Sequence, residues 1–410
     1  MTLKKNFQFL LIVLIILTGL IPISGSALDT TNVSSPIWSK TLGQDKVLVA
    51  CSDNASFIVA GSDTGNLQLY DNTGKIIWAY STTGTSFSSV SISGDGETIS
   101  GTTGGSVLVF DHDGKLHFNY NTTTTVIRSA VSDNGYMITS SEDNLSMFDP
   151  NGNLLGNVLQ PGAIWDVAIS DDGRYGAAAV DLGWQTRKGK ILVIDRNGSE
   201  VLDFSTKNQG VGVGISSEGS SIVGIDDYNL YSVFRNGTLR WSFPSSPPFW
   251  DVAITPDGRY IVTGSQYYLR VFNETGSLLW QNQEPGYVYS VAISDDGDYI
   301  IAGSSDQVRL FDKSGNLLWH YDQGAVHVAA SKNGDYFAVG TKDKVYFFNR
   351  WGNATIIDNS TSPGITTISF TSNTSSTNQP TTKSAPVSSG LIFFAVSCIV
   401  IIWIKGRQEK

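Results

Sequence analysis

The sequence predicts an all-β fold, an eight-bladed β-propeller of four-stranded antiparallel blades, with an N-terminal signal peptide and a C-terminal transmembrane helix. The first observation is an internal repeat of about forty residues that carries four short apolar runs per copy. The second is composition, because 42 Gly, 12 Pro and 2 Cys in 410 residues are typical of short strands joined by tight turns, not of a disulfide framework. The third is an apolar run at each end of the chain.

The clearest copy of the repeat begins at Val291. Its first half reads V-A-I-S-D-D-G-D-Y-I-I-A-G-S, and its second half, V-R-L-F-D-K-S-G-N-L-L-W, ends at Trp319. The β-branched and aromatic runs predict strands, and the Asp-Asp-Gly between the first two supplies the positive φ that a tight hairpin needs. The first copy has Ala55 in place of the hairpin glycine. The other copies align on Gly96, Gly135, Gly173, Gly219, Gly258, Gly297 and Gly334.

The two ends of the repeat region predict how the ring closes. Trp38 stands in a short run before the first copy, where it matches the fourth-strand tryptophans of other copies. The last copy has Ile356 at that position. We therefore expect the Trp38 strand to complete the last blade, which gives eight blades. Seven blades are the alternative if the first or third copy fails to form a full blade.

Residues outside the repeats predict export and anchoring in a membrane. Two lysines, an apolar run and small residues are typical of a signal peptide at 1–27, with an uncleaved anchor as the alternative. The apolar segment 386–404 is long enough to span a bilayer, and the basic tail 405–410 predicts a cytoplasmic C-terminus. A buried helix or a processed sorting tail is the alternative for this segment.

The segments between these ends predict an extracellular domain on a stalk. We expect a propeller over 36–357 and a disordered stalk at 358–385, whose Ser and Thr residues cannot bury enough surface to fold. Ten Asn-x-Ser/Thr sequons favour a glycoprotein. The formal net charge of −10 argues against a nucleic-acid partner, because an acidic surface repels phosphates. The expected location is the cell membrane, crossed once, with the propeller outside.

No group of residues in the sequence predicts catalysis or metal binding. The four His residues show no metal-ligand spacing. The aspartates beside the hairpin glycines are interpreted as turn residues, whose side chains bond to nearby backbone. These aspartates are Asp95, Asp133, Asp171, Asp172, Asp257, Asp295 and Asp296.

Aromatic and polar residues favour a binding surface at the start of the innermost strand in copies four, six and seven. The same face carries the loop between the second and third strands, which copy four lengthens with an aromatic and basic insertion. Exposed aromatics beside a basic loop suit a protein, peptide or glycan partner. The alternative is that the two tryptophans of these strands pack between blades. The candidate rim comprises Trp165, Asp166, Trp184, Arg187, Trp250, Asp251 and Tyr289.

The copies resemble two known repeat families. The turn and fourth strand from Asp71 to Trp78, D-N-T-G-K-I-I-W, resemble the tryptophan-docking repeat of the quinoprotein (PQQ-like) dehydrogenases, whose domains are eight-bladed propellers. The first half of each copy resembles the WD-type repeat. With its predicted leader, stalk and anchor, the whole chain resembles the membrane-anchored propeller surface proteins common in archaea.

The quinoprotein resemblance implies a quinone beside a disulfide of adjacent cysteines, together with a calcium ion. This chain has no adjacent cysteines, and several copies lack the docking tryptophan, so we expect no cofactor. The replacing residues are Phe118, Gly156, Leu202 and Ile356. The expected function is a non-catalytic cell-surface module that binds or scaffolds an extracellular protein, peptide or glycan. The alternatives are a quinoprotein-like oxidoreductase or other enzyme that uses the propeller axis, and a purely structural envelope protein.

Overall fold

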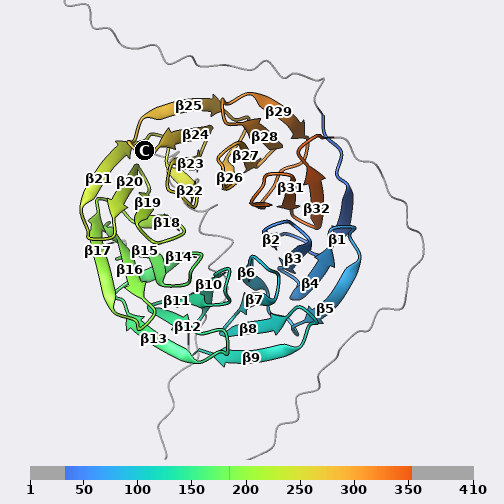
Figure 1. Cartoon of the computed structure of the whole chain (residues 1–410), viewed down its shortest axis with the longest axis horizontal. Coiled ribbons are helices and arrows are strands. Elements are labelled where there is room, and N and C mark those ends of the chain that lie inside the picture. Colours follow the sequence, from blue (N-terminus) through green and yellow to red (C-terminus); the bar gives the residue numbers. More distant parts are fainter. Residues whose placement is uncertain (1–32, 123, 184, 353–410) are drawn as a thin grey trace, which may run out of the picture. The chain divides into compact units, whose positions relative to one another are not determined.

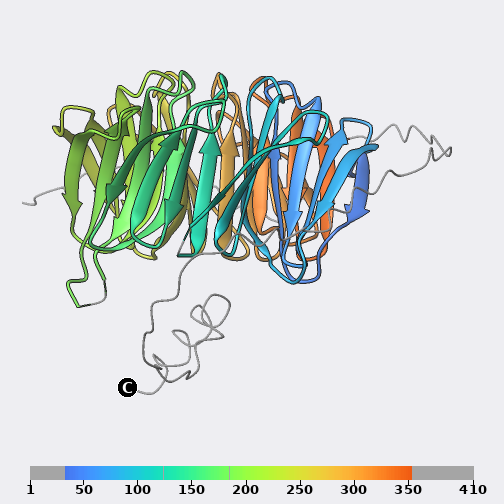
Figure 2. The same ribbon diagram turned by 90° about the horizontal axis from the view of Figure 1, so that it is seen from below.

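The computed structural model contains the predicted propeller, with eight sheets arranged around a central axis (Figure 1). It describes residues 33–122, 124–183 and 185–352. Every sheet has four antiparallel strands, which cross the ring from one face to the other (Figure 2). The predicted all-β propeller of four-stranded antiparallel blades is confirmed, with eight blades and not seven.

Several predictions concern residues that the structure does not describe. They are the signal peptide at 1–27, the last residues of the propeller range at 353–357, the stalk at 358–385, the transmembrane helix at 386–404 and the tail at 405–410. Within the described ranges, no helix has the length and apolar character needed to cross a membrane. Export, anchoring and topology therefore stay predictions.

The strands of each blade follow one another in the chain, except in blade 8. Blades 1 and 2 comprise β2 (Val47–Cys51), β3 (Phe57–Ser62), β4 (Asn66–Asp71), β5 (Ile76–Ser81), β6 (Phe87–Ile92), β7 (Thr98–Thr103), β8 (Ser106–Asp111) and β9 (Leu116–Asn121). Blades 3 and 4 comprise β10 (Val126–Val131), β11 (Met137–Ser141), β12 (Asn144–Phe148), β13 (Leu154–Leu159), β14 (Ala163–Ile169), β15 (Tyr175–Asp181), β16 (Gly189–Asp195) and β17 (Glu200–Thr206).

The second half of the ring repeats this order. Blades 5 and 6 comprise β18 (Gly210–Ile215), β19 (Ser221–Asp226), β20 (Asn229–Phe234), β21 (Leu239–Pro244), β22 (Phe249–Ile254), β23 (Tyr260–Ser265), β24 (Tyr268–Asn273) and β25 (Leu278–Gln283). Blades 7 and 8 comprise β26 (Val288–Ile293), β27 (Tyr299–Ser304), β28 (Val308–Asp312), β29 (Leu317–Tyr321), β30 (His327–Ala330), β31 (Tyr336–Gly340), β32 (Lys344–Asn349) and β1 (Trp38–Thr41).

The N-terminal strand closes the ring. β1 pairs antiparallel with β32 and places Trp38 opposite Phe347, and the two aromatic rings stack with their centroids 5.3 Å apart. Nearer the axis, the backbone N–H of Lys332 in blade 8 donates to the carbonyl of Asp53 in blade 1 at 2.7 Å. The predicted closure is confirmed, so blade 8 contains strands from both ends of the repeat region.

A belt of tryptophans joins neighbouring blades near the circumference. A tryptophan in the fourth strand of one blade packs against the glycine in the turn between the third and fourth strands of the next. Gly74 shows why glycine is needed there, because its φ is +82° and a Cβ would lie 2.7 Å from the Trp38 ring. Trp38 Nε1 also donates to the carbonyl of Asn72 at 3.0 Å. The same type of bond is made by Trp78, Trp241 and Trp280.

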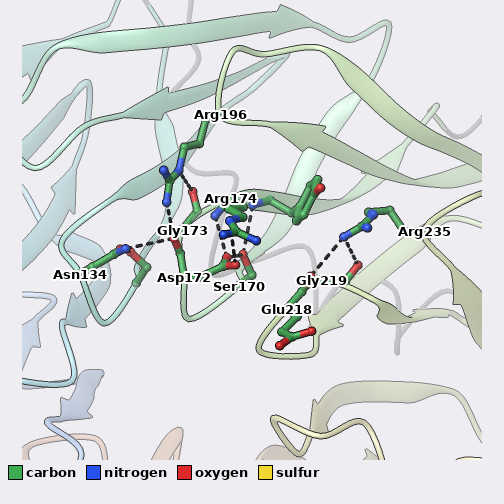
Figure 3. Close-up of polar contacts among 11 residues, drawn as sticks. Asn134, Ser170, Asp172, Gly173, Arg174, Arg196, Glu218, Gly219 and Arg235 are labelled. Atoms are coloured by element: carbon green, nitrogen blue, oxygen red, sulfur yellow. Dashed lines mark hydrogen bonds and ion pairs between the residues drawn. The ribbon is translucent and has the colours of Figure 1, made fainter.

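The tryptophan belt is interrupted on both sides of blade 4. Gly156 of blade 3 and Leu202 of blade 4 stand at the position of the tryptophan. Arginines provide other contacts on the face that carries the hairpins between first and second strands, which we call the hairpin face (Figure 3). Within blade 4, Arg196 donates to the carbonyl of Gly173 at 2.8 Å, and from blade 3 Asn134 donates to the carbonyl of Asp172 at 3.0 Å (Figure 3).

The two arginines of this region also stack on the preceding blade. The guanidinium carbon of Arg196 in blade 4 lies 3.9 Å from the ring centroid of Tyr136 in blade 3. Arg235 of blade 5 repeats the arrangement at 4.1 Å from the Tyr175 ring of blade 4. Cation–π contacts of this kind contribute about 0.5–2 kcal/mol each. Arg196 and Arg235 thus link blade 4 to its two neighbours, at the interfaces where Gly156 and Leu202 stand in place of the tryptophan.

The hairpin aspartates divide into two groups. In the first group, the carboxylate accepts a hydrogen bond from the backbone N–H two residues later, so the turn interpretation is confirmed for Asp95, Asp172, Asp257 and Asp296. The turn interpretation is wrong for the second group, which stands one position earlier in the hairpin. Asp133 pairs with Lys332, Asp171 bonds to the side chain of Ser217, and burial raises the pKa of both Asp171 and Asp295 against the lowering effect of the Lys332 charge.

The second group forms an acidic ring at the axis. Lys332 Nζ of blade 8 lies 2.6 Å from Asp133 Oδ2 of blade 3 and 2.9 Å from Asp53 Oδ2 of blade 1. Blades 3 and 8 are not neighbours, so their side chains can meet only across the axis. Burial raises the pKa of Asp295 to about 6, against the opposing charge of Lys332. We call Asp53, Asp133, Asp171 and Asp295 the acidic ring.

Candidate functional site

A β-bulge at the start of the innermost strand sets the geometry of the candidate rim. In blades 2 to 7 the register between the first and second strands shifts at this point. A bulge leaves one residue unpaired and re-aims its side chain. Trp165, Trp250 and Tyr289 occupy the unpaired position in blades 4, 6 and 7. The bulge therefore presents all three on the face opposite the hairpins, which we call the rim face.

Two of these three aromatic side chains are accessible. Trp165 is 43% exposed and Tyr289 is 38% exposed. The Trp165 indole N–H donates to Asp181 of the same blade at 3.3 Å, so this side chain does not fill a gap between blades. Trp250 is half-buried and contacts tyrosines of the next blade. Packing between blades thus describes Trp250 and not Trp165.

Trp250 belongs to a cluster of four aromatic side chains from blades 6 and 7. Its ring lies edge-on to those of Tyr287 and Tyr289, with centroids 6.2 Å away in both cases. Tyr287 and Tyr289 are parallel to within 8°, and Tyr267 lies 5.7 Å from Tyr287. We call Trp250, Tyr267, Tyr287 and Tyr289 the aromatic cluster.

Polar groups hold the aromatic cluster in place. Gln266 Nε2 donates to the hydroxyl of Tyr287 at 2.9 Å and to the hydroxyl of Tyr267 at 3.2 Å. Tyr267 is nevertheless 40% exposed. Sequence reasoning missed Tyr267 and Tyr287, which precede their strands. The spacing of Tyr287 and Tyr289 was the available signal, because residues two apart in an extended chain point to the same side.

Asp166 and Asp251 connect neighbouring blades. Asp166 accepts a hydrogen bond from the backbone N–H of Val213 at 3.1 Å, and Asp251 accepts one from Val291 at 2.8 Å. Both bonds cross to the next blade. Burial raises the pKa of Asp166, and burial raises the pKa of Asp251 to about 7. The structure thus places these two candidate rim residues between blades, where they accept backbone hydrogen bonds.

The long loop of blade 4 connects β15 to β16. Arg187 is exposed on this loop and has a φ of +52°, a left-handed conformation that is uncommon outside glycine. Trp184 lies outside the described residues, so its role stays a prediction. Lys190, at the end of the loop, is buried and its ammonium lies 2.8 Å from Asp203. The described part of the loop therefore adds two exposed cations, Arg187 and Lys188, to the rim face.

The arrangement is suited to binding by aromatic and polar contacts. In the part of the chain that the structure describes, no group of three His, Cys, Asp or Glu side chains is placed to hold a metal ion. The acidic ring already contains the ammonium of Lys332. Large, half-exposed aromatic side chains held by a hydrogen-bonded neighbour provide contact area that costs little ordering.

Comparisons with known families agree with this architecture. Residues 218–398 match the family described as outer membrane protein assembly factor BamB, and residues 57–180 match a family of unknown function (DUF5711). A comparison with curated proteins found no match. The chain is a β-propeller protein with PQQ-like repeats.

Solved structures share the fold at low sequence identity. Sqt1 of Chaetomium thermophilum, crystallised with the N-terminus of ribosomal protein L10, is 16% identical with a TM-score of 0.64, over 76% of this chain and 100% of that chain. The C-terminal WD40 domain of Sif2 is 14% identical with a TM-score of 0.65, over 77% of this chain and 98% of that chain. At these identities the likeness concerns the fold alone.

Proposed function

We propose that this propeller is a non-catalytic module that binds a protein partner on its rim face and scaffolds it at the cell surface. The aromatic cluster is the observation that carries this proposal. Tyr267 and Tyr289 are each about two-fifths exposed. The ring of Tyr289 packs against Trp250, and the ring of Tyr267 packs against Tyr287. Trp and Tyr in such settings dominate the binding energy of protein interfaces.

The two faces of the ring differ, and the difference supports the rim face as the binding surface. On the hairpin face, Arg196 and Arg235 are engaged in contacts between blades, and Lys332 is held in the acidic ring. On the rim face, the bulges leave Trp165 and Tyr289 unpaired near the starts of their strands, and both side chains are accessible. The cations named on the hairpin face are thus engaged within the ring, whereas Trp165, Tyr267 and Tyr289 of the rim face remain accessible.

A propeller of this fold can hold a protein segment, since Sqt1 was crystallised with the N-terminus of ribosomal protein L10. That precedent favours a protein over a glycan as the partner. Surface location is supported by the predicted signal peptide at 1–27 and by the apolar segment 386–404 with its basic tail. Digestion of intact cells with a protease tests it, because an outside propeller is cleaved and an inside one is protected.

Partner capture by the full-length chain tests the binding face. The double substitution Tyr267→Ala with Tyr289→Ala removes two exposed rings and leaves Trp250 in place. We expect capture from cell envelopes to fall at least about tenfold, since each hot-spot ring contributes about 1–2 kcal/mol or more. Trp351→Ala is the matched control, because Trp351 is 58% exposed and follows the third strand of blade 8, on the hairpin face.

Thermal unfolding of both variants completes the test. Exposed side chains away from the core usually change stability by no more than about 0.5 kcal/mol, so both should unfold like the parent. Undiminished capture by the double variant would refute the proposal that the partner binds on the rim face. Capture that survives protein digestion of the partner but not glycan removal would instead make the partner a glycan.

A further inference from the structure

A polar cavity of about 180 Å³ lies between the innermost strands of blades 8, 1, 2, 3 and 4. Its position at the start of these strands places it on the rim face. A space of this size can hold several water molecules or one short side chain. The lining residues are Leu48, Ser88, Ser89, Val90, Arg128, Ser129, Asp166, Val167 and His327.

Arg128 supplies the strongest positive charge in this cavity. Its guanidinium donates to the carbonyl of Ser88 at 3.1 Å, and its Nε lies 4.0 Å from Asp166 Oδ1. The other oxygen of Asp166 accepts from the backbone of Val213. The Arg128 side chain is 40% exposed, so a ligand can reach it from the solvent. A guanidinium presents several N–H donors in a plane that matches a carboxylate.

His327 and Lys46 add to this basic environment. Burial, with the charges of Arg128 and Lys46, lowers the pKa of His327 to about 4, and one ring nitrogen bonds to the backbone of Val49. The other nitrogen, Nδ1, is buried without a hydrogen-bond partner among the described residues. Burial and then the Arg128 charge lower the pKa of Lys46 to about 8. The basic groups therefore repel one another, a repulsion that a bound anion would relieve.

We propose that this cavity binds a carboxylate, presented by an acidic side chain or the C-terminus of the protein partner. Arg128 clamps the carboxylate, and Ser88 and Ser89, whose hydroxyls bond to Thr102 and Ser129, line the same wall. His327 takes up a proton as the carboxylate binds, so that Nδ1 becomes a donor toward it. A phosphate dianion is disfavoured because the Asp166 carboxyl lines the same cavity. This inference rests on the proposed function and names the chemistry of its ligand.

Calorimetry on the purified full-length chain tests the carboxylate site. The probes are the capped tripeptide acetyl-Gly-Glu-Gly-amide and its Gln analogue, with inorganic phosphate as a third arm, all at one ionic strength. We expect the Glu peptide to bind at least about tenfold more tightly than the Gln peptide, a difference of about 1.4 kcal/mol. Binding should tighten between about pH 7.5 and 5.5, since a proton is taken up on His327. Histidine-selective NMR should show the pKa of His327 rising from about 4 toward 6.5.

Substitutions distinguish specific binding of the carboxylate in the cavity from non-specific attraction between charges. Arg128→Gln should abolish the preference for Glu, and His327→Gln should keep binding but remove its pH dependence. Arg174→Gln is the control, because Arg174 is an exposed cation on the hairpin face, 3.3 Å from Asp172. Equal binding of the two peptides, retained preference in Arg128→Gln, or tighter binding of phosphate would each overturn the proposal.

The result is also distinguishable from failure of the proposed function. The double variant Tyr267→Ala with Tyr289→Ala should lose the partner and still bind the Glu peptide, because neither tyrosine lines the cavity. If Arg128→Gln failed to fold, its loss of peptide binding would not be informative. The pH dependence of peptide binding by His327→Gln would then test the site, since this variant keeps Arg128. If the chain captured its partner but bound the Glu and Gln peptides equally, the carboxylate site would be refuted, and the proposal that the partner binds on the rim face would still hold.

Discussion

Replacing one belt tryptophan should weaken the whole ring, and Trp78→Ala is the sharpest case. Trp78 is 5% exposed and lies between blades 1 and 2. Its ring centroid is 5.1 Å from that of Phe110, and its indole N–H donates to the carbonyl of His112 at 3.1 Å. Both partners belong to the next blade, so the substitution removes a contact between blades and leaves pairing within each sheet intact.

The expected loss follows from burial and hydrogen bonding. Truncation of a buried aromatic side chain to alanine costs about 3–5 kcal/mol. The lost hydrogen bond adds about 1 kcal/mol at most, because the His112 carbonyl lies in a turn where water can replace the indole. We therefore expect the free energy of unfolding to fall by about 4 kcal/mol, with a drop of roughly 10 °C in Tm.

Urea unfolding followed by tryptophan fluorescence and circular dichroism measures this loss. Trp351→Ala is the control, because an indole that is 58% exposed should change the free energy of unfolding by no more than about 0.5 kcal/mol. A loss below about 1 kcal/mol for Trp78→Ala, or equal losses for the two variants, would show that the belt does not hold the blades together.

Two further predictions concern pH and charge. Burial raises the pKa of Asp251 from 3.8 to about 7. The protonated side chain therefore contributes its full stabilisation below pH 3.8, and this stabilisation is lost as the pH rises from there through about 7. Asp251→Asn should flatten the dependence of the urea midpoint on pH between about 4 and 8, and an unchanged dependence would contradict this origin. Lys332→Gln leaves the acidic ring without its cation and should cost about 1–2 kcal/mol at neutral pH, less below about pH 5 as the carboxyls protonate. A loss that does not vary with pH would mean that Lys332 acts by packing alone.

The architecture could be predicted because each copy of the repeat marks its own register. The turn glycine and the fourth-strand tryptophan, such as Gly74 and Trp78, recur in step, so the number of blades and the place of Trp38 follow from the sequence. The contact of Lys332 with Asp133 could not be predicted in this way. These residues are 199 positions apart, and a repeat period does not say which side chains meet across an axis.

The candidate rim could be predicted only in part. Trp165, Trp250 and Tyr289 differ from equivalent residues of other copies, and a comparison of copies is enough to find them. Tyr267 and Tyr287 precede their strands, where the repeat sets no register. The cavity beside Arg128 depends on how side chains from five blades pack, which the sequence pattern does not specify.

Because the tryptophan belt is interrupted at blade 4, the interfaces between blades differ in stability around the ring. A closed ring opens first at its weakest interface between blades, and both interfaces of blade 4 depend on arginine–tyrosine stacking where the other interfaces have an aromatic side chain packed on a turn glycine. Amide protons of β14 and β17 should therefore exchange with solvent sooner than those of blades 6 and 7. We therefore expect blade 4, which holds Trp165 and the long loop, to be the blade that shifts most readily when a partner binds.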